Sequence, residues 1–300
     1  MLLLYKTFSF SAAFWALCMF IFLQTLKCTP GEDTLGQCSE DHQYAFPRWQ
    51  TDYSIIGKSP GLGLRPKQSE DLIDSALITF NTDDNQEGDK VENWKDWDKR
   101  IKEFLKGYEG ADKKGVVCDE KSGQKADQTK ACQVKLSDLG ACYTTPGYGY
   151  KEGNPCIFLK LNKIFNLENE AVELNDTDTL PVNMPEEMKD HIKGQANKNQ
   201  VWVQCKGKYP ADKEALSGAN TIRYFPKTQG FPNYYFPYTA QPDYLSPLIA
   251  VQFNVAKNIG QLIHIECRAF AKNIGYNRRD KVGISVFEIQ VHDSTSVPKM

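Results

Sequence analysis

The longest apolar run of the chain lies near its N-terminus. Residues 8–26 contain no charged side chain and consist mainly of aromatic and aliphatic residues. As an α-helix rising about 1.5 Å per residue, this run spans roughly 28 Å, close to the thickness of a bilayer hydrocarbon core. The pattern therefore predicts one transmembrane helix over residues 8–26, preceded by a short cytoplasmic segment, residues 1–7.

A cleaved signal peptide is the main alternative for this run. Its apolar stretch is usually shorter, roughly 7 to 15 residues, and is followed by a small-x-small cleavage site, which residues 26–29 do not provide. One lysine lies on each side of the run, Lys6 and Lys27, so the positive charges alone do not orient the helix.

Apolar positions next recur at steps of three and four residues between Val91 and Tyr108, with charged residues between them. This spacing predicts an amphipathic helix over 91–108 whose tryptophans pack in the core. Gly107 and Gly110 are suited to end it.

Beyond this helix the pattern changes to short runs rich in Ile, Val and Phe, which is typical of strands. The predicted strands cover residues 156–161, 201–205, 248–255, 261–271 and 282–291. Residues 59–66 and 143–155, rich in Pro and Gly, are predicted to be extended or looped. Short strands with long connections predict a β-sandwich, so the chain is mainly β with an added α-helix. We expect a membrane-proximal stalk over 27–66 and one extracellular, disulfide-bonded sandwich over 67–300.

The cysteines indicate an oxidising compartment. Nine are present in the 300 residues, and Cys18 lies within the predicted span. An even number remains outside it, without the close spacing and nearby histidines that a zinc site requires. These cysteines are Cys28, Cys38, Cys118, Cys132, Cys142, Cys156, Cys205 and Cys267. Disulfides are therefore expected, and Cys205 with Cys267, each in a predicted strand, could join the two sheets.

Charge and short motifs narrow the function further. The net charge of −2 gives no basic surface for nucleic acid. Asn175 begins an acceptor site for N-linked sugar in a polar stretch, consistent with a body outside the cytoplasm. No nucleotide-binding or nucleophile motif is present, and no Asp-Lys pair continues into the phosphorylation motif of cation pumps. We expect no catalytic residue, metal or cofactor.

The C-terminal half carries a specific resemblance. Residues 231–253, which include Phe-Pro-Asn-Tyr-Tyr-Phe-Pro-Tyr, strongly resemble the β-subunit of the sodium/potassium-transporting ATPase, particularly its invertebrate members. Motifs over 149–156, 160–163, 266–276 and 59–66 agree with the family in the same order. The gastric hydrogen/potassium pump β-subunit is a close relative that shares many of them.

The resemblance implies one membrane helix that bears an immunoglobulin-like sandwich with an added helix. It implies a single-pass type II protein of the plasma membrane with its C-terminal domain outside the cell. By motif, the implied disulfides are Cys118–Cys132, Cys142–Cys156 and Cys205–Cys267; Cys28 and Cys38 lie outside this set, and their pairing is a further hypothesis.

The resemblance also implies a non-catalytic subunit that assists folding, assembly and surface delivery of a catalytic α-subunit and modulates potassium transport. The implied partners are that subunit, the bilayer and, as an additional candidate, a small single-span regulatory subunit. An adhesion or junction role for the glycosylated ectodomain, independent of the pump, is the rival interpretation.

Two groups of residues are candidate contacts with the α-subunit. Aromatic residues give a large, stiff contact area at low entropic cost, although packing within the sandwich is an equal alternative for them. The extracellular candidates are Tyr234, Tyr235, Tyr238 and Tyr244. The intramembrane candidates are Phe8, Ala12, Ala13, Phe14 and Ala16, where small residues allow close helix packing and lipid contact is the alternative for either phenylalanine.

Overall fold

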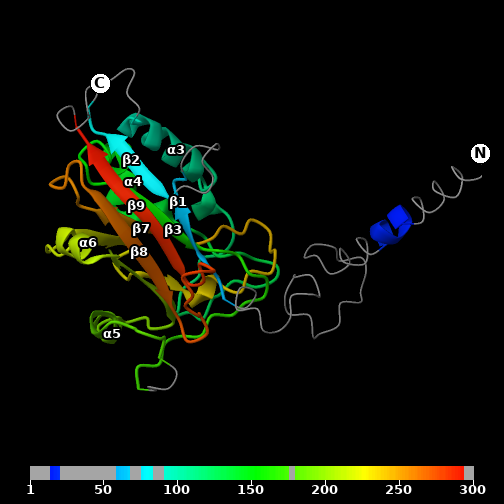
Figure 1. Ribbon diagram of the computed structural model, residues 1–300. Coiled ribbons are helices and arrows are strands. Elements are labelled where there is room, and N and C mark those ends of the chain that lie inside the picture. Colours follow the sequence, from blue (N-terminus) through cyan, green and yellow to red (C-terminus); the bar gives the residue numbers. More distant parts are fainter. Residues whose placement is uncertain (1–13, 21–58, 68–75, 84–90, 176–179, 294–300) are drawn as a thin grey trace, which may run out of the picture.

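The computed structural model describes residues 14–20, 59–67, 76–83, 91–175 and 180–293, and within them the chain forms two sheets (Figure 1). The first sheet has the strand order β1–β3–β7–β5 and the second β2–β9–β8–β4–β6. The pairing is antiparallel throughout the named strands, except that β2 and β9 are parallel. The chain is therefore mainly β, as predicted.

The strands are short and unevenly spaced. The first sheet consists of β1 (Leu62–Arg65), β3 (Cys156–Leu161), β7 (Ile249–Phe253) and β5 (Ile222–Phe225). The second consists of β2 (Leu77–Asn81), β9 (Ile284–His292), β8 (Leu262–Phe270), β4 (Gln200–Gly207) and β6 (Gly230–Pro232).

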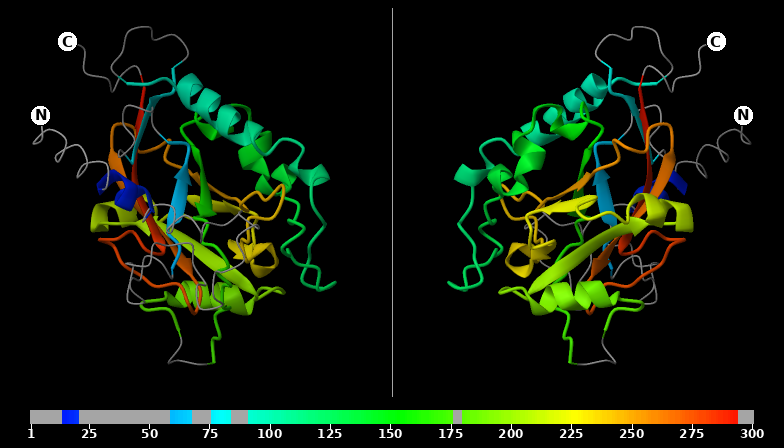
Figure 2. Two further views of the ribbon diagram at one scale, coloured as in Figure 1. Left: turned by 90° about the vertical axis from the view of Figure 1, so that its right-hand side faces the viewer. Right: turned by 90° about the vertical axis from the view of Figure 1, so that its left-hand side faces the viewer.

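Between these strands, the described part of the chain forms four α-helices and four 3-10 turns. The α-helices are α3 (Trp94–Lys106), α4 (Ala141–Thr144), α5 (Glu186–Lys193) and α6 (Pro210–Ala215). The 3-10 turns are η2 (Ala111–Lys113), η3 (Leu136–Leu139), η4 (Pro146–Gly149) and η6 (Asn233–Tyr235). Figure 2 shows α3 along one side of the two sheets and α5 at the other end of the domain.

The five predicted strands all occur, as β3, β4, β7, β8 and β9, with small shifts of their ends. The boundary expected between stalk and sandwich differs. β1 lies within the segment assigned to the stalk, yet it pairs with β3 from Leu62 opposite Leu161 to Arg65 opposite Phe158. Its four residues are bounded by Pro60 and Pro66, which suits a short edge strand better than a linker.

The main core lies between the inner faces of the two sheets. Phe253 of β7 and Phe287 of β9 are fully buried, and their rings meet edge to face with centroids 5.8 Å apart. Full burial of an aromatic side chain contributes roughly 2–3 kcal/mol of hydrophobic free energy, and such ring pairs contribute somewhat more. This contact joins the sheets face to face.

Helix α3 begins at Trp94 because Asn93 caps it. The Asn93 side chain accepts from the backbone N–H of Lys95, and the Asp96 side chain accepts from the backbone N–H of Asn93. This reciprocal cap satisfies two backbone donors and fixes the start of the helix three residues later than predicted. The helix ends at Lys106 with Gly107 in a right-handed conformation, and the chain turns left-handed only at Gly110 (φ 72°).

Trp97 attaches α3 to the sandwich. Its side chain is fully buried and stacks on Tyr150 with ring centroids 5.8 Å apart, while its Nε1–H donates to the backbone oxygen of Thr79 over 3.0 Å. The prediction that the tryptophans of this helix pack in the core is confirmed for Trp97. Trp94 is only partly buried.

A smaller apolar cluster covers the outer face of the second sheet. Helix α5 places Met188 and Ile192 over Trp202 of β4 and Phe270 of β8, and all four side chains are buried. This half of the sheet is thus apolar on both faces.

The described residues contain three disulfides, and their cysteine pairs are those implied by the family resemblance. They are Cys118–Cys132, Cys142–Cys156 and Cys205–Cys267. The expectation that Cys205 and Cys267 join the two sheets was wrong. These residues lie directly opposite each other on β4 and β8, so they connect neighbouring strands of one sheet.

The predicted span 8–26 lies mostly outside the described residues. Residues 14–20 are helical, and their large apolar side chains, Phe14 among them, are exposed. Among the residues that the structure describes, no helix has the length and apolar character needed to cross a bilayer.

We predict that Trp97→Ala lowers the free energy of unfolding of the two-sheet domain by about 3–5 kcal/mol, because it removes a buried ring and leaves a cavity under α3. Chemical denaturation of the full chain in detergent, followed by near-UV circular dichroism, measures this loss. Glu103→Ala, at an exposed position of the same helix, is the control and should change stability by less than about 0.5 kcal/mol. Equal effects of the two variants would contradict the packing role of Trp97.

We also predict that the disulfides differ in their contribution to stability. Cys205–Cys267 closes a sequence separation of 62 and Cys118–Cys132 one of 14. In the loop-entropy model these contribute roughly 4 and 3 kcal/mol, respectively. Replacing both cysteines of each pair by alanine should therefore lower the denaturation midpoint more for the 205–267 pair. The opposite order would show that chain entropy does not dominate here.

Candidate partner-binding surface

The candidate surface is built on residues 234–244, which we call the aromatic segment. It begins within η6 and precedes β7, and it contains four tyrosines and Phe236. The backbone is held at two points, since Ala126 N–H donates to Tyr234 O over 2.8 Å and Asn166 N–H donates to Tyr238 O over 2.8 Å. Ala126 lies in the loop closed by the first disulfide, so this crosslinked loop supports the segment.

A buried glutamine closes the turn within the segment. Gln241 is only 4% exposed, and its Nε2 donates to the backbone oxygen of Pro237 over 3.1 Å. Its Oε1 accepts from the backbone N–H of Thr239 over 2.7 Å. These bonds satisfy polar groups that would be costly to bury unpaired, and they fix the loop between Tyr238 and Tyr244.

Tyr235 points into the domain. It is 9% exposed, and its hydroxyl donates to the backbone oxygen of Gln133 over 3.0 Å. Burial raises the pKa of its phenol well above the usual range. Of the four tyrosine candidates, Tyr235 is the one whose surroundings favour core packing over contact with a partner.

Tyr238 and Tyr244 form a half-exposed pair around a lysine. Their ring centroids are 4.9 Å apart, and the Lys163 ammonium lies 4.8 Å from the Tyr238 ring centroid and 5.0 Å from that of Tyr244. An ammonium over aromatic faces is attracted by about 0.5–2 kcal/mol per ring, depending on exposure. Burial lowers the pKa of Lys163.

The pair borders a shallow hollow of about 270 Å³. Lys114 and Asp243, 3.6 Å apart, lie on its rim. Sequence reasoning noted the motif that contains Lys163 but assigned the lysine no role. Its contact with the tyrosines depends on tertiary structure, and no local pattern in the sequence could have indicated it.

More positive charge gathers around Lys163. Lys160, on β3, has a pKa lowered first by burial and then by the charges of Arg65, Lys163 and Lys67. We call these four residues the basic cluster. Within the described residues none of the four forms an ion pair with a carboxylate. Among the described residues, the Tyr238–Tyr244 end of the surface therefore has an excess of positive charge.

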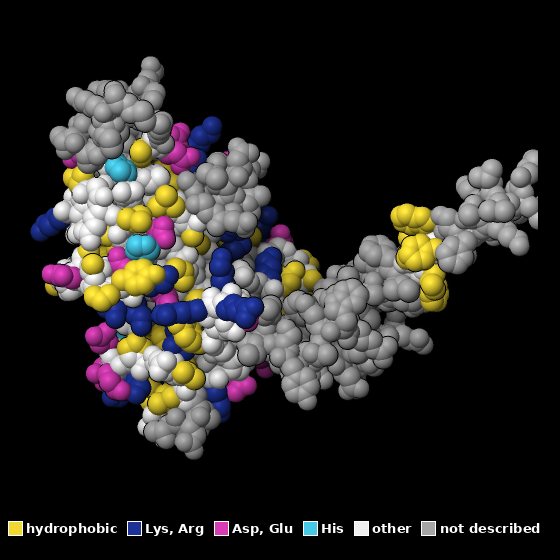
Figure 3. All heavy atoms as spheres, viewed as in Figure 1, with side chains coloured by type: hydrophobic (Ala, Val, Ile, Leu, Met, Phe, Trp, Pro, Cys, Tyr) yellow, Lys and Arg dark blue, Asp and Glu magenta, His cyan; other side chains and the backbone are white. Residues whose placement is uncertain are grey.

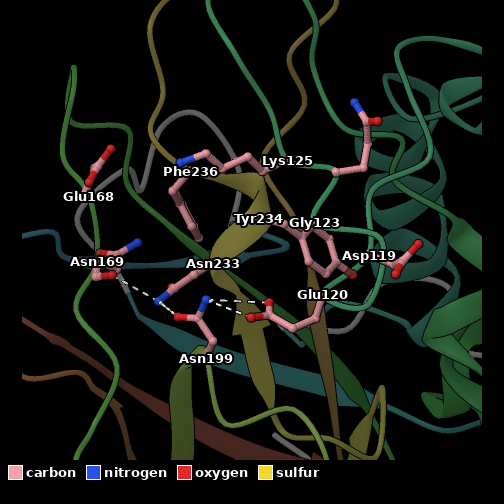
Figure 4. A pocket seen from close by; sticks show the side chains of 11 residues that line it. Asp119, Glu120, Gly123, Lys125, Glu168, Asn169, Asn199, Asn233, Tyr234 and Phe236 are labelled. Carbon is pink, nitrogen blue, oxygen red and sulfur yellow. Dashed lines mark hydrogen bonds between the residues drawn. The ribbon is translucent and has the colours of Figure 1, made fainter.

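The other end of the aromatic segment is polar and acidic. Tyr234 and Phe236 line a hollow of about 220 Å³, together with amide and carboxylate side chains (Figure 4). At its floor Asn233 donates to Asn199 Oδ1 over 2.7 Å, and Asn199 donates to Glu120 Oε1 over 3.1 Å.

The acidic side chains around this hollow affect Tyr234. Burial raises the pKa of Tyr234, and the negative charges of Asp138, Asp119 and Glu120 add to this effect. The surface thus changes sign along the segment, from acidic at Tyr234 to basic at Lys163.

The remaining predicted residues fall elsewhere. Asn175 is exposed in a turn, as expected of a glycosylation site, and its use remains a prediction. Phe14 and Ala16 lie exposed in the short described helix. Phe8, Ala12, Ala13, Cys28 and Cys38 lie outside the described residues, so the intramembrane contacts and the extra cysteine pair stay predictions.

Comparisons with known proteins place these features in a family. The sequence matches the family described as "Sodium / potassium ATPase beta chain" over residues 1–287. It is 41% identical over 250 residues to the sodium/potassium-transporting ATPase subunit beta-1 of Drosophila melanogaster, covering 81% of this chain and 74% of that protein. It is 35% identical over 291 residues to subunit beta-2 of the same species, covering 93% and 80%. The human subunit beta-2 is 28% identical over 313 residues, covering 97% and 86%.

We predict that Tyr108 makes the region behind this surface sensitive to alkaline pH. Its hydroxyl donates to Ser246 O over 3.1 Å, and burial raises its pKa to about 12 from 10.0. A raised folded-state pKa gives stability that is complete below pH 10 and is lost as pH rises through 12. The shift corresponds to at most about 3 kcal/mol.

Unfolding measured at pH 8 and pH 11 tests this. Tyr108→Phe should lose about 1 kcal/mol at pH 8 with its hydrogen bond, but should lose less additional stability between the two pH values than the parent chain. If both proteins lost the same amount of stability between pH 8 and pH 11, Tyr108 would not be the group responsible for the alkaline sensitivity.

Proposed function

The chain belongs to the sodium/potassium ATPase β-chain family, whose members are non-catalytic subunits, and we propose that it assembles with a pump α-subunit and assists its folding and delivery to the plasma membrane. The proposal includes modulation of potassium transport and a type II orientation with the sandwich outside the cell. It also includes the finer assignment of the fold as immunoglobulin-like. The match over residues 1–287 is the observation that carries it.

The aromatic segment supports the proposed contact with the α-subunit. Tyr238 and Tyr244 are partly exposed on a loop fixed by the buried Gln241, so a partner would not have to order them. Pre-organised aromatic side chains lose little entropy on binding and commonly carry much of the binding energy. Tyr235 contributes indirectly, by anchoring the segment to the domain.

Charge adds specificity to this surface. A partner that presents carboxylates opposite the basic cluster and cations opposite Glu120 would match the change of sign along the segment. In the reverse orientation like charges would face each other, which is unfavourable. We therefore infer that electrostatics sets the orientation of the complex, while the tyrosines supply most of the contact energy.

A β-subunit of this kind can modulate potassium transport only through contacts that differ between the conformational states of the pump. The Lys163–tyrosine group is suited to such a role. Its ammonium is held by ring faces without a carboxylate partner among the described residues, so it remains available to a carboxylate of one pump conformation.

Assembly can be tested by co-expressing the full chain with a sodium-pump α-subunit in animal cells. The amount of complex recovered by affinity purification is then measured. We expect Tyr238→Ala combined with Tyr244→Ala to reduce recovered α-subunit by about tenfold, the effect of removing contacts worth 1–2 kcal/mol. Tyr143→Ala, a tyrosine 42% exposed elsewhere on the domain, is the matched control and should leave recovery unchanged.

Lys163→Gln tests the charge separately from the rings. It should lower recovery and weaken the dependence of complex stability on salt, whereas Lys257→Gln should do neither. A complex insensitive to all these changes would remove the aromatic segment from the interface. Surface delivery of the folded chain without any α-subunit would instead favour the rival adhesion role.

A further inference from the structure

The outer face of the second sheet carries two buried charges side by side. Glu266 and Arg268 lie two residues apart on β8, on the same face, and are only 2% and 7% exposed. This face continues beyond the apolar cluster under α5, since Phe270 of that cluster is the next outward residue of the strand. Charges in such positions are costly unless they are paired and hydrogen-bonded.

The two charges are satisfied unequally. Glu266 accepts from Arg278 Nε over 2.9 Å and from the Tyr276 hydroxyl over 3.5 Å. Arg268 Nε is buried without a hydrogen-bond partner among the described residues, and the guanidinium forms no ion pair with any of them.

Aromatic rings hold the Arg268 guanidinium in place. Its central carbon lies 4.1 Å from the Tyr276 ring centroid and 4.6 Å from that of Phe270. Such contacts stabilise a cation and fix its plane, but they supply no acceptor for its N–H groups. The Glu266 carboxylate, two residues away on the strand, is already used by Arg278, and Arg268 Nε has no acceptor among the described residues.

Further cations surround the pair. Lys206 of β4 lies opposite Glu266 in the strand register and is exposed, and the Arg278 side chain is 57% exposed. Figure 3, which looks onto this face, shows a band of Lys and Arg side chains across it. Three cations, Arg268, Arg278 and Lys206, therefore lie around the Glu266 carboxylate.

The positive area is small. On one side Gln204 of β4 donates to Glu187 over 3.4 Å, and on the other Glu288 faces His264 at 3.6 Å. These two glutamates bound the cations, so the surface suits a group with one or two carboxylates better than a long polyanion, whose further charges would meet Glu187 or Glu288.

We propose that Arg268, Arg278, Lys206 and Tyr276 form a docking surface for a short acidic peptide segment of a partner polypeptide. A carboxylate of that segment accepts from the Nη groups of the Arg268 guanidinium, which are not among its buried atoms, while Lys206 and Arg278 contact a second acidic group. A guanidinium held flat by rings is suited to such paired hydrogen bonds. The proposal uses β4, β8 and the turn after β8, and it does not depend on the aromatic segment.

The test uses the full chain in lipid nanodiscs and a fluorescein-labelled peptide, Gly-Ser-Glu-Glu-Ser-Gly, with anisotropy as the readout. We expect saturable binding, and binding about tenfold weaker for the same peptide with glutamine in place of glutamate. Arg268→Lys, which keeps the charge but loses the planar fork, should weaken binding by about tenfold. Lys206→Glu should weaken it by about threefold or more, and Lys257→Glu, an equal change of charge at a distant exposed site, should not.

Near-UV circular dichroism first establishes that each variant is folded. If Arg268→Lys does not fold, Lys206→Glu and the glutamine peptide still decide the result. Three results would overturn the proposal: equal binding of the two peptides, equal binding by the parent chain and Lys206→Glu, or absence of saturable binding. Tighter binding of a heparin tetrasaccharide than of the acidic peptide also overturns it, because the surface would then recognise sulfated polysaccharide.

Discussion

The contact between the inner faces of the two sheets is the interaction on which the rest of the structure depends. Phe253 of β7 and Phe287 of β9 meet there, and the surface loop that holds the candidate tyrosines is joined to β7. The aromatic segment leads directly into β7, and its position is therefore fixed by the register of that strand against β3 and β5. A binding surface on this segment is therefore held in place by the packing of the core.

Sequence patterns predicted the helix and the strands that are long enough to show a periodic or continuous apolar pattern. The strands that became β3, β4, β7, β8 and β9 are long enough to show alternation or an apolar run, and α3 has a regular apolar stripe. β1, β5 and β6 contain three or four residues, too few for a periodic signal, and their pairing is decided by neighbouring strands. The same limit explains why β1 was placed in the stalk.

The candidate surface was only partly predictable for a related reason. The tyrosines are visible in the sequence as a cluster, but they do not alternate regularly, so nothing local indicates that Tyr235 points inward while Tyr238 and Tyr244 remain half-exposed. The role of Lys163 depends on its contact with Tyr238, which is distant in the sequence. The role of Arg268 depends on its unpaired Nε, which no sequence pattern indicates. Charge balance over the whole chain, −2, conceals local surfaces of both signs.

The position of β9 has a consequence for biosynthesis. Although it is the last strand of the described chain, it lies inside the second sheet, hydrogen-bonded to β2 on one side and β8 on the other. During translation the edge of β2 therefore stays unpaired while some two hundred further residues are synthesised. The second sheet cannot form completely until nearly all of these residues have left the ribosome. A chaperone that shields this edge would act on a chain from which β2 has emerged and β9 has not, and chains that stop short of β9 would present the same exposed edge to quality control.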